Sequence, residues 1–409
     1  MTIVKLPGRS PPPRDSSSHG SPVENRIKLG GVVKIDWASA QMVECISRQL
    51  YSLPTKNGMR RKARYEVESC AGRFPLGWLQ LFYGVTIALV TTDTSSDCES
   101  MLRLQGIIPP LVTPLAAQDE LDIDGVDRVV EHVVQGGVHG LFILGSCGEG
   151  PSLSYRLRRE MIARVCERVN GRVPVLVGIT DSSFTESIAL ADFAEDAGAT
   201  AVVASAPYYF APSQTELSGY VHRLHEEVPL PLILYNMPGL TKVTFELPTL
   251  TELIELPKLL AIKDSSGDLD YYSSVAQLLA KYRPDMSLLM GPEHLLAASM
   301  ARGGAGGVNG GANLFPHLFV QWYEALSQDE FEVAQQLETI VGELQAIYHI
   351  GSGHSAVPKA LKAGLKHLGI CSDLPSLPFD RFNANHRARI ADVLDSVAEH
   401  MPQAVRSAV

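Results

Sequence analysis

The chain has 409 residues, of which 45% are hydrophobic and 20% charged, and its formal net charge is -10. A chain of this length and composition can bury at least one large core, so it is expected to be globular. The negative charge and the lack of a long Lys/Arg run argue against a nucleic-acid-binding protein.

Cysteine usage and hydropathy exclude two further classes. The six cysteines include no C-x-x-C pair and none at the spacing of a zinc site, so no metal is predicted. The most membrane-like stretch, residues 78–90, is interrupted by Gln80 and Gly84 and is shorter than the roughly 20 apolar residues that span a bilayer. Reduced thiols and the lack of a membrane segment predict a cytoplasmic protein with no membrane partner.

Residues 1–100 differ from the rest of the chain. Short apolar pieces alternate with a proline run at 11–13 and a basic run at 60–62, and no helical or strand period persists. This composition predicts a poorly ordered extension. Met101 opens a sequence that would serve as a protein start, so an over-annotated N terminus is the other explanation. The folded part is predicted to be residues 101–409.

After residue 105, short β-branched or aliphatic runs alternate with amphipathic helical patterns. Each run recurs after roughly 20 to 35 residues, the length of a strand with its crossover helix. Right-handed crossovers between eight near-equal units predict an α/β fold, a TIM (β/α)8 barrel. An open doubly wound sheet is the alternative, but the G-x-G-x-x-G turn that it requires does not occur. The predicted strands are 107–112, 140–144, 173–177, 201–204, 232–234, 259–262, 287–290 and 306–308.

Helical patterns continue after the eighth predicted strand. They cover residues 315–350, 355–367 and 379–400, which is more than the last helix of a barrel needs. The sequence therefore predicts a helical C-terminal extension to the barrel.

The reactive groups of a (β/α)8 barrel lie where its strands end. Four predicted strand ends are chemically unusual. They carry Gly-Ser-Cys-Gly-Glu at 145–149, Pro-Tyr-Tyr at 207–209, Tyr-Asn-Met-Pro at 235–238 and Lys-Asp-Ser-Ser-Gly-Asp at 263–268. The last residue of the first motif, Glu149, is expected to brace its turn.

Lys263 follows the apolar run 259–262, so its amine is expected to project from a buried strand into the barrel mouth. Removal from water favours the neutral form of an amine. A neutral amine can attack a ketone and form a Schiff base. The alternative is a lysine whose charged end reaches solvent from the strand end and has no chemical role.

Three other strand-end side chains can serve such a lysine. Tyr235 ends the neighbouring strand, where its phenol can transfer protons. Ser146 and the backbone amides of its turn can bind a carboxylate, or Ser146 can pass a proton from Tyr235 to Tyr209. Each residue alone also has an unreactive explanation, a core tyrosine or a tight turn. No histidine lies in a triad-like setting near Cys147, so a nucleophilic role is not predicted for it.

At these positions the sequence resembles the dihydrodipicolinate synthase and N-acetylneuraminate lyase superfamily, over residues 106–400. Residues 145–149 are similar to the family's G-[ST]-[ST]-G-E, and residues 235–238 to its Y-N-x-P. Lys263 lies in a K-D-S-S-G-D that is similar to the family's lysine segment. Each motif alone is weak, but all three occur in the family's order.

The resemblance implies a class I Schiff-base lyase that acts on pyruvate or another 2-oxo acid. Lys263 would form the imine, Tyr235 would transfer protons, and Ser146 and Cys147 would lie at the turn that binds the pyruvate carboxylate. Tyr209 matches a tyrosine that crosses a subunit boundary to complete the proton relay. A homo-oligomer, a dimer or a homotetramer, is therefore implied, and no metal or organic cofactor is.

Two departures from the family pattern bear on the second substrate. The synthases carry an arginine two residues after Y-N-x-P, whereas this chain has Leu240, which cannot pair with a carboxylate. The neuraminate lyases carry an acidic pair after the seventh strand, and only its first carboxylate is kept here, as Glu293. Further substrate contacts are expected from Gly291, directly after the seventh strand, and from Val308 and Asn309 at the end of the eighth strand.

These residues favour an aldolase that cleaves or forms a 2-keto-3-deoxy sugar acid or an N-acetylneuraminate-like adduct of pyruvate and an aldehyde. The alternative within the fold is 4-hydroxy-tetrahydrodipicolinate synthase, which joins pyruvate and aspartate semialdehyde. A non-catalytic keto-acid-binding regulator is the alternative from another class, but a regulator needs neither an imine lysine nor a proton shuttle. The sequence leaves aldol cleavage and dehydration as alternatives.

Overall fold

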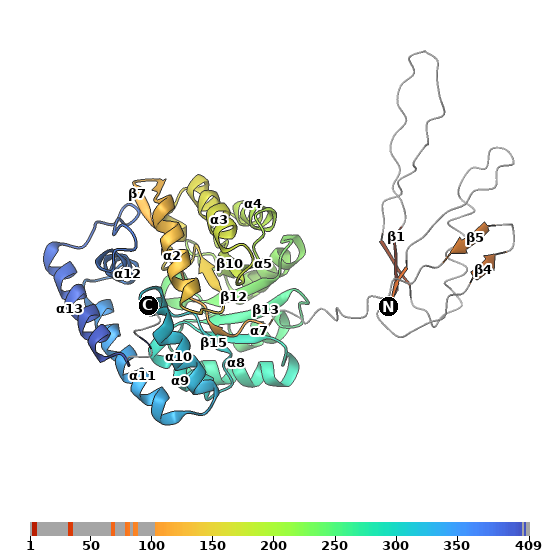
Figure 1. Ribbon diagram of the computed structural model, residues 1–409. Helices are drawn as coiled ribbons and strands as arrows, with labels where there is room; N and C mark the ends of the chain where they lie inside the picture. Colours follow the sequence, from red (N-terminus) through yellow and green to blue (C-terminus); the bar gives the residue numbers. More distant parts are fainter. Residues whose placement is uncertain are drawn as a thin grey trace, which may run out of the picture. The chain divides into compact units, whose positions relative to one another are not determined.

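The computed structural model describes residues 103–402 and 405, together with five short strands nearer the N terminus (Figure 1). The chain divides into two units, Met1–Glu99 and Ser100–Val409, and each is considered by itself. In the first unit β1 pairs antiparallel with β2 and β3, and β4 pairs with β5. The predicted extension of residues 1–100 otherwise lies outside the described residues. The bounds are β1 Thr2–Lys5, β2 Val32–Ile35, β3 Val67–Ser69, β4 Trp78–Leu81 and β5 Val85–Ala88.

Eight parallel strands form one curled sheet in the order β6-β15-β14-β13-β12-β11-β10-β9. The first and last strands meet where Pro110 bridges to Phe142 and the Leu111 amide donates to the Phe142 carbonyl over 2.8 Å. These contacts close the sheet, so the predicted barrel is confirmed. The strands are β6 Gly106–Ile107, β9 Leu141–Ile143, β10 Val175–Gly178, β11 Ala201–Ser205, β12 Leu232–Asn236, β13 Leu259–Asp264, β14 Ser287–Met290 and β15 Gly306–Gly307.

The first barrel strand is shorter than predicted. The prediction was residues 107–112, whereas β6 ends at Ile107. Pro109 and Pro110 follow, and proline has no amide hydrogen to donate to a neighbouring strand. A small hairpin then precedes the first helix, formed by β7 Leu115–Ala117 and β8 Glu120–Leu121.

Every barrel strand is followed by helix, and the helices surround the sheet (Figure 1). Local sequence explains several of the helix starts. The Asp122 carboxylate accepts from the Gly125 amide over 2.9 Å, and Ser213 forms a capping box with Glu216. The helices are α2 Ile123–Gln135, α3 Tyr155–Val169, α4 Phe184–Asp196, α5 Gln214–Glu227, α6 Pro238–Thr241, α7 Leu247–Leu253, α8 Leu269–Tyr282, α9 Leu296–Met300 and α10 Pro316–Ser327.

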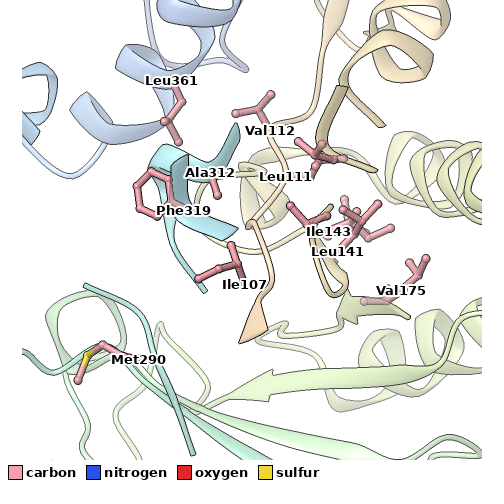
Figure 2. Close-up of a cluster of buried hydrophobic side chains, with 14 of the residues drawn as sticks. Ile107, Leu111, Val112, Leu141, Ile143, Val175, Met290, Ala312, Phe319 and Leu361 are labelled. Atoms are coloured by element: carbon pink, nitrogen blue, oxygen red, sulfur yellow. The ribbon is translucent and has the colours of Figure 1, made fainter. Parts of the chain in front are cut away.

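The barrel has an inner and an outer apolar core because successive side chains of a strand point to opposite faces. On β11, Ala201 and Val203 belong to the inner cluster, whereas Val202 and Ala204 belong to the outer cluster between sheet and helices. Figure 2 shows part of the outer cluster, including Phe319 of α10. The filled interior leaves the carboxyl-terminal mouth as the place for chemistry.

Three long helices form the predicted C-terminal extension. The pattern over residues 315–350 is broken at Gln328, where α10 has ended, and a second helix begins at Phe331. No helix in the described part of the chain is long and apolar enough to cross a membrane. The bounds are α11 Phe331–Leu344, α12 Ala356–His367 and α13 Ala384–His400, with short 3-10 turns η1 Gly150–Ser152, η2 Glu293–Leu295, η3 Gly310–Asn313 and η4 Gln345–His349 elsewhere.

Candidate active site

The register of β12 and β13 places Tyr235 opposite Lys263 and Asn236 opposite Asp264. Asn236 and Asp264 are fully buried, and the Asn236 Nδ2 donates to Asp264 Oδ1 over 2.7 Å. The Asn236 Oδ1 in turn accepts from the Phe245 amide over 3.1 Å. This buried contact fixes the two strand ends against each other, and with them the side chains of Tyr235 and Lys263.

Lys263 lies in the wall of the mouth and is 5% exposed. Its Nζ is 4.0 Å from the centroid of the Tyr235 ring and 4.7 Å from that of Phe142. None of the ion pairs found in residues 103–402 includes Lys263. The amine thus lies beside two aromatic rings and belongs to no ion pair in this part of the chain.

Ser146 lies on the turn that follows β9. Its Oγ is 3.5 Å from the Tyr235 hydroxyl, a long contact in which either atom can be the donor. The turn is flanked by two non-glycine residues whose backbones lie in the left-handed region, Leu144 with φ 59° and Glu149 with φ 56°. Each such residue stores roughly 1 to 3 kcal/mol of strain, so the surroundings must hold the turn in this shape.

The Glu149 side chain anchors this turn to the C-terminal extension. Its Oε2 accepts from the Ser376 amide and hydroxyl over 2.7 and 2.8 Å. Its Oε1 forms a buried ion pair with Lys362 of α12, whose Nζ also donates to the Leu374 carbonyl over 2.8 Å. Glu149 therefore braces the turn, as its sequence position predicted, through partners more than 200 residues away.

A cavity of about 570 Å³ opens at this mouth. Of the predicted site residues, Ser146, Cys147, Tyr235, Lys263, Gly291, Glu293 and Val308 line it. Burial raises the pKa of the Cys147 thiol to about 11, which keeps the thiol protonated near neutrality. The structure therefore brings most of the predicted residues to one cavity.

Two predicted residues lie elsewhere. Asn309 is fully buried and is not part of the cavity wall; its Nδ2 donates to the Gly291 carbonyl over 3.1 Å. Its side chain thus supports the end of β14. Tyr209 is 77% exposed, and its ring packs edge-on against Phe210, which is 82% exposed, with centroids 4.9 Å apart. Within one chain, Tyr209 does not join the other three catalytic candidates.

Glu293 is the most unusual group in the cavity wall. It is 4% exposed, and its Oε2 accepts from the Gly311 amide over 2.8 Å and from the Tyr348 hydroxyl over 3.3 Å. Its Oε1 has no hydrogen-bond partner among the described residues. Burial raises the pKa of Glu293 to about 7, although the hydrogen bonds from Gly311 and Tyr348 lower it.

The sequence did not indicate that the C-terminal extension contributes to the cavity. Tyr348 and His349 of η4, His354 and Ser355 all line it. These residues follow no recognisable motif, and the sequence showed only a gap between the helical patterns 315–350 and 355–367. Among the described residues, no group of three or more His, Cys, Asp or Glu side chains is placed to hold a metal ion.

The closed barrel and the cavity at its carboxyl-terminal mouth, which Lys263 and Tyr235 line, define a (β/α)8-barrel enzyme. The model of the dihydrodipicolinate synthetase family matches residues 103–397. The chain therefore belongs to this family and is one of its lyases.

Relatives with known sequences or structures agree with this assignment. The chain is 33% identical over 285 residues to the 4-hydroxy-tetrahydrodipicolinate synthase of Methanopyrus kandleri. The aligned region covers 68% of this chain and 90% of that protein. It is 47% identical to the dihydrodipicolinate synthase structure from Bacteroides thetaiotaomicron, with a TM-score of 0.69 over 72% of this chain and 98% of that one. It is also 26% identical to YagE from E. coli K12, solved in complex with pyruvate, with a TM-score of 0.68 and the same coverage.

Proposed function

We propose that this lyase forms a Schiff base between Lys263 and pyruvate or another 2-oxo acid, and then makes or breaks a carbon–carbon bond to an aldehyde. The observation that carries the proposal is the position of Lys263. Its amine lies in the cavity wall beside the Tyr235 ring and belongs to no described ion pair. The solved complex of a relative with pyruvate supports the choice of 2-oxo acid.

The chemistry begins when the neutral Lys263 amine attacks the keto carbon of the 2-oxo acid. The carbonyl oxygen leaves as water after it has taken two protons, and we assign their transfer to Tyr235 and Ser146; the 3.5 Å between the two hydroxyl groups supports this assignment. The protonated imine withdraws electrons from the neighbouring carbon, which loses a proton and becomes an enamine. The enamine carbon adds to the aldehyde, and water then releases the product from Lys263.

The Ser146 turn is the proposed site of the 2-oxo acid's carboxylate. Its backbone amides and the Ser146 hydroxyl are donors that can hold an anion. The strained backbone at Leu144 and Glu149, held by the buried Lys362, supports a preorganised rather than an adaptable turn.

A second subunit is proposed to cover Tyr209. An exposed pair of aromatic rings at a strand end is typical of a contact surface. A partner placed there would bring Tyr209 toward a neighbouring site and complete a proton relay with Tyr235. The expected assembly is a dimer or a homotetramer, which light scattering measures directly; Tyr209→Glu should dissociate it.

A 2-keto-3-deoxy sugar acid is the preferred substrate class. Leu240 lines the cavity where an arginine would be needed for a carboxylate-bearing aldehyde. The closest competing reaction is 4-hydroxy-tetrahydrodipicolinate synthesis, which the names of several relatives support. Cytoplasmic location and independence from metals and organic cofactors are part of the same proposal.

Steady-state assays test the proposed function. Pyruvate release is measured from 2-keto-3-deoxy sugar acids and N-acetylneuraminate, and pyruvate consumption is measured with aspartate semialdehyde. The sugar acids are expected to give the highest kcat/KM, and Lys263→Arg is expected to abolish turnover because an arginine stays protonated. Near-normal turnover by Lys263→Arg would overturn the Schiff-base proposal, and a clear preference for aspartate semialdehyde would replace the substrate class.

A further inference from the structure

The C-terminal extension forms one wall of the active-site cavity, and this wall is polar without carrying a fixed charge. The extension reaches the cavity mainly through η4 and the loop that joins η4 to α12. Among its described residues, no Lys, Arg, Asp or Glu lines the cavity. Besides Tyr348, whose hydroxyl donates to Glu293, the polar side chains that line it are an amide, two imidazoles and a hydroxyl, those of Gln345, His349, His354 and Ser355.

Histidines without a partner gather at this cavity. Of the 12 histidines in the chain, the structure describes all except His19. Seven have a hydrogen bond, an ion pair or a ring contact, namely His132, His139, His222, His225, His367, His386 and His400. The other four have no such contact among the described residues. Three of these four line the cavity, His294, His349 and His354, and the fourth is His317.

The loop that carries His354 has a defined shape. Ile350 and Ala356, at its two ends, are 2% and 4% exposed. Between them Gly351 has a φ of 103°, which L side chains rarely adopt, and a Cβ there would lie 2.8 Å from the Phe382 ring. The loop is therefore anchored at both ends and close to an aromatic ring in the middle, which presents its imidazole from a fixed position.

The two imidazoles of the extension and the reactive amine occupy different depths of the cavity. His349 and His354 are exposed, whereas Lys263 is 5% exposed. Side chains that line a cavity and also reach solvent lie where the cavity opens. A substrate attached to Lys263 therefore extends its far end toward the imidazoles.

The chemistry of this wall matches hydroxyl groups. A neutral imidazole offers one donor and one acceptor, and an amide and a hydroxyl also do both, as a ligand hydroxyl does. A carboxylate or a phosphate only accepts, and Arg or Lys is the side chain that binds it most strongly. Because the extension places neither on the cavity, its wall favours a hydroxylated chain over an anion.

We propose that His349 and His354 determine specificity for the second substrate by hydrogen-bonding the hydroxyl groups at the end away from the reacting carbonyl. The inference rests on the proposed function, since it assumes that the aldehyde joins an enamine on Lys263. The two histidines form no covalent bond. They select a hydroxylated aldehyde over an alkyl aldehyde of the same length.

A matched pair of aldehydes tests this inference. Glyceraldehyde and propionaldehyde have the same three-carbon chain and differ in two hydroxyl groups. For condensation with pyruvate, the ratio of their kcat/KM values measures recognition of the hydroxyls. In the double variant His349→Leu, His354→Leu this ratio is expected to fall about 10-fold, the scale of one or two hydrogen bonds. The loss should appear in KM for glyceraldehyde, and kcat/KM for propionaldehyde should stay within about twofold.

Two further variants provide controls. His317 is half-buried, does not line the cavity and also has no hydrogen bond among the described residues, so His317→Leu should leave the ratio unchanged. The double variant His349→Gln, His354→Gln keeps a donor and an acceptor at each position and should retain the ratio within about threefold. The ratio compares two aldehydes on one sample, so a smaller folded fraction of any variant cancels.

The inference and the proposed function fail in different ways. A double Leu variant with a ratio within twofold of the unchanged protein, or a double Gln variant that loses the ratio as far as the Leu variant does, would overturn the inference. The borohydride-trapped pyruvate adduct should form in every variant, because imine formation precedes the aldehyde. Failure of the unchanged protein to form any adduct would instead overturn the proposed function.

Discussion

The barrel mouth contains two buried glutamates and two buried lysines, and they are used in opposite ways. Glu149 and Lys362 form an ion pair, and Ser376 and Leu374 satisfy the atoms that remain. Glu293 and Lys263 line the cavity, and neither forms an ion pair among the described residues.

Whether a buried charged group has a partner of opposite charge separates structural groups from groups that are available for chemistry. A buried ion pair with all its hydrogen bonds made has no reason to exchange protons with a ligand. A buried carboxyl without a cation keeps its proton near neutrality, and a buried amine without a carboxylate can become a nucleophile. The paired residues hold the turn at 145–149, and the unpaired ones line the cavity.

Breaking the structural pair should have the largest effect on stability. Lys362→Met leaves the Glu149 carboxylate buried without its partner and is expected to lower the free energy of unfolding by about 3 to 5 kcal/mol. Urea denaturation measures the change. The matched control on the same helix is Lys366→Met, whose half-exposed side chain pairs with Asp373 over 3.0 Å; less than about 1 kcal/mol is expected there.

The double variant Glu149→Gln with Lys362→Met should recover much of the stability lost by Lys362→Met, because no uncompensated charge remains. If Lys362→Met alone is as stable as the unchanged protein, the pair does not hold the turn.

Tyr235→Phe changes the surroundings of the unpaired Lys263. It removes the hydroxyl that lies 3.5 Å from Ser146 while keeping the ring beside Lys263. Turnover is expected to fall about 100-fold or more, the usual scale for a positioned proton donor, while some pyruvate adduct still forms. Single-turnover kinetics with borohydride trapping separates the two effects, and an unchanged kcat would remove Tyr235 from the relay.

Glu293→Gln should change how stability depends on pH. In the folded protein the pKa of Glu293 is raised from 4.5 to about 7, so folding takes up a proton between these values. The contribution of Glu293 to the free energy of unfolding is therefore lost as pH rises from about 4.5 through 7. The Gln variant has no such contribution to lose. The melting temperature of the variant, relative to the unchanged protein, should be higher at pH 8 than at pH 5, by more than about 2 °C. Equal differences at both pH values would show that Glu293 is charged in the fold.

Removal of residues 1–100 should have the smallest effect. Both the paired and the unpaired residues lie between positions 149 and 362, and the first barrel strand begins at Gly106. A chain that begins at Met101 is expected to keep its folding and its kcat/KM. Loss of soluble protein on this truncation would show that the N-terminal segment stabilises the barrel.

Sequence reasoning located the unpaired lysine but not the paired one. Lys263 and Tyr235 could be found because each follows an apolar strand, and strand ends of a barrel converge on one mouth. Lys362 lies in an amphipathic helix, where its position predicts nothing about Glu149, 213 residues earlier. Periodicity shows which face of a helix is buried, but not which distant residue lies against it.

The orientation of side chains was the other limit. Asn309 follows the eighth strand, as a substrate-binding residue would, yet its amide turns to the carbonyls of Met290 and Gly291. Glu293 was expected to bind substrate, but its protonation depends on burial and on the donors Gly311 and Tyr348, which the chain supplies from two later segments. Such properties emerge only when the fold brings these segments together.

Reductive trapping tests the central claim that Lys263 is the reactive amine. Pyruvate with borohydride should convert the imine to a stable adduct, and peptide mass spectrometry should place that adduct on Lys263 and not on the buried, ion-paired Lys362. Lys263→Arg should form no adduct. A protein that remains unmodified after reduction, or an adduct that persists in Lys263→Arg, would contradict the Schiff-base account.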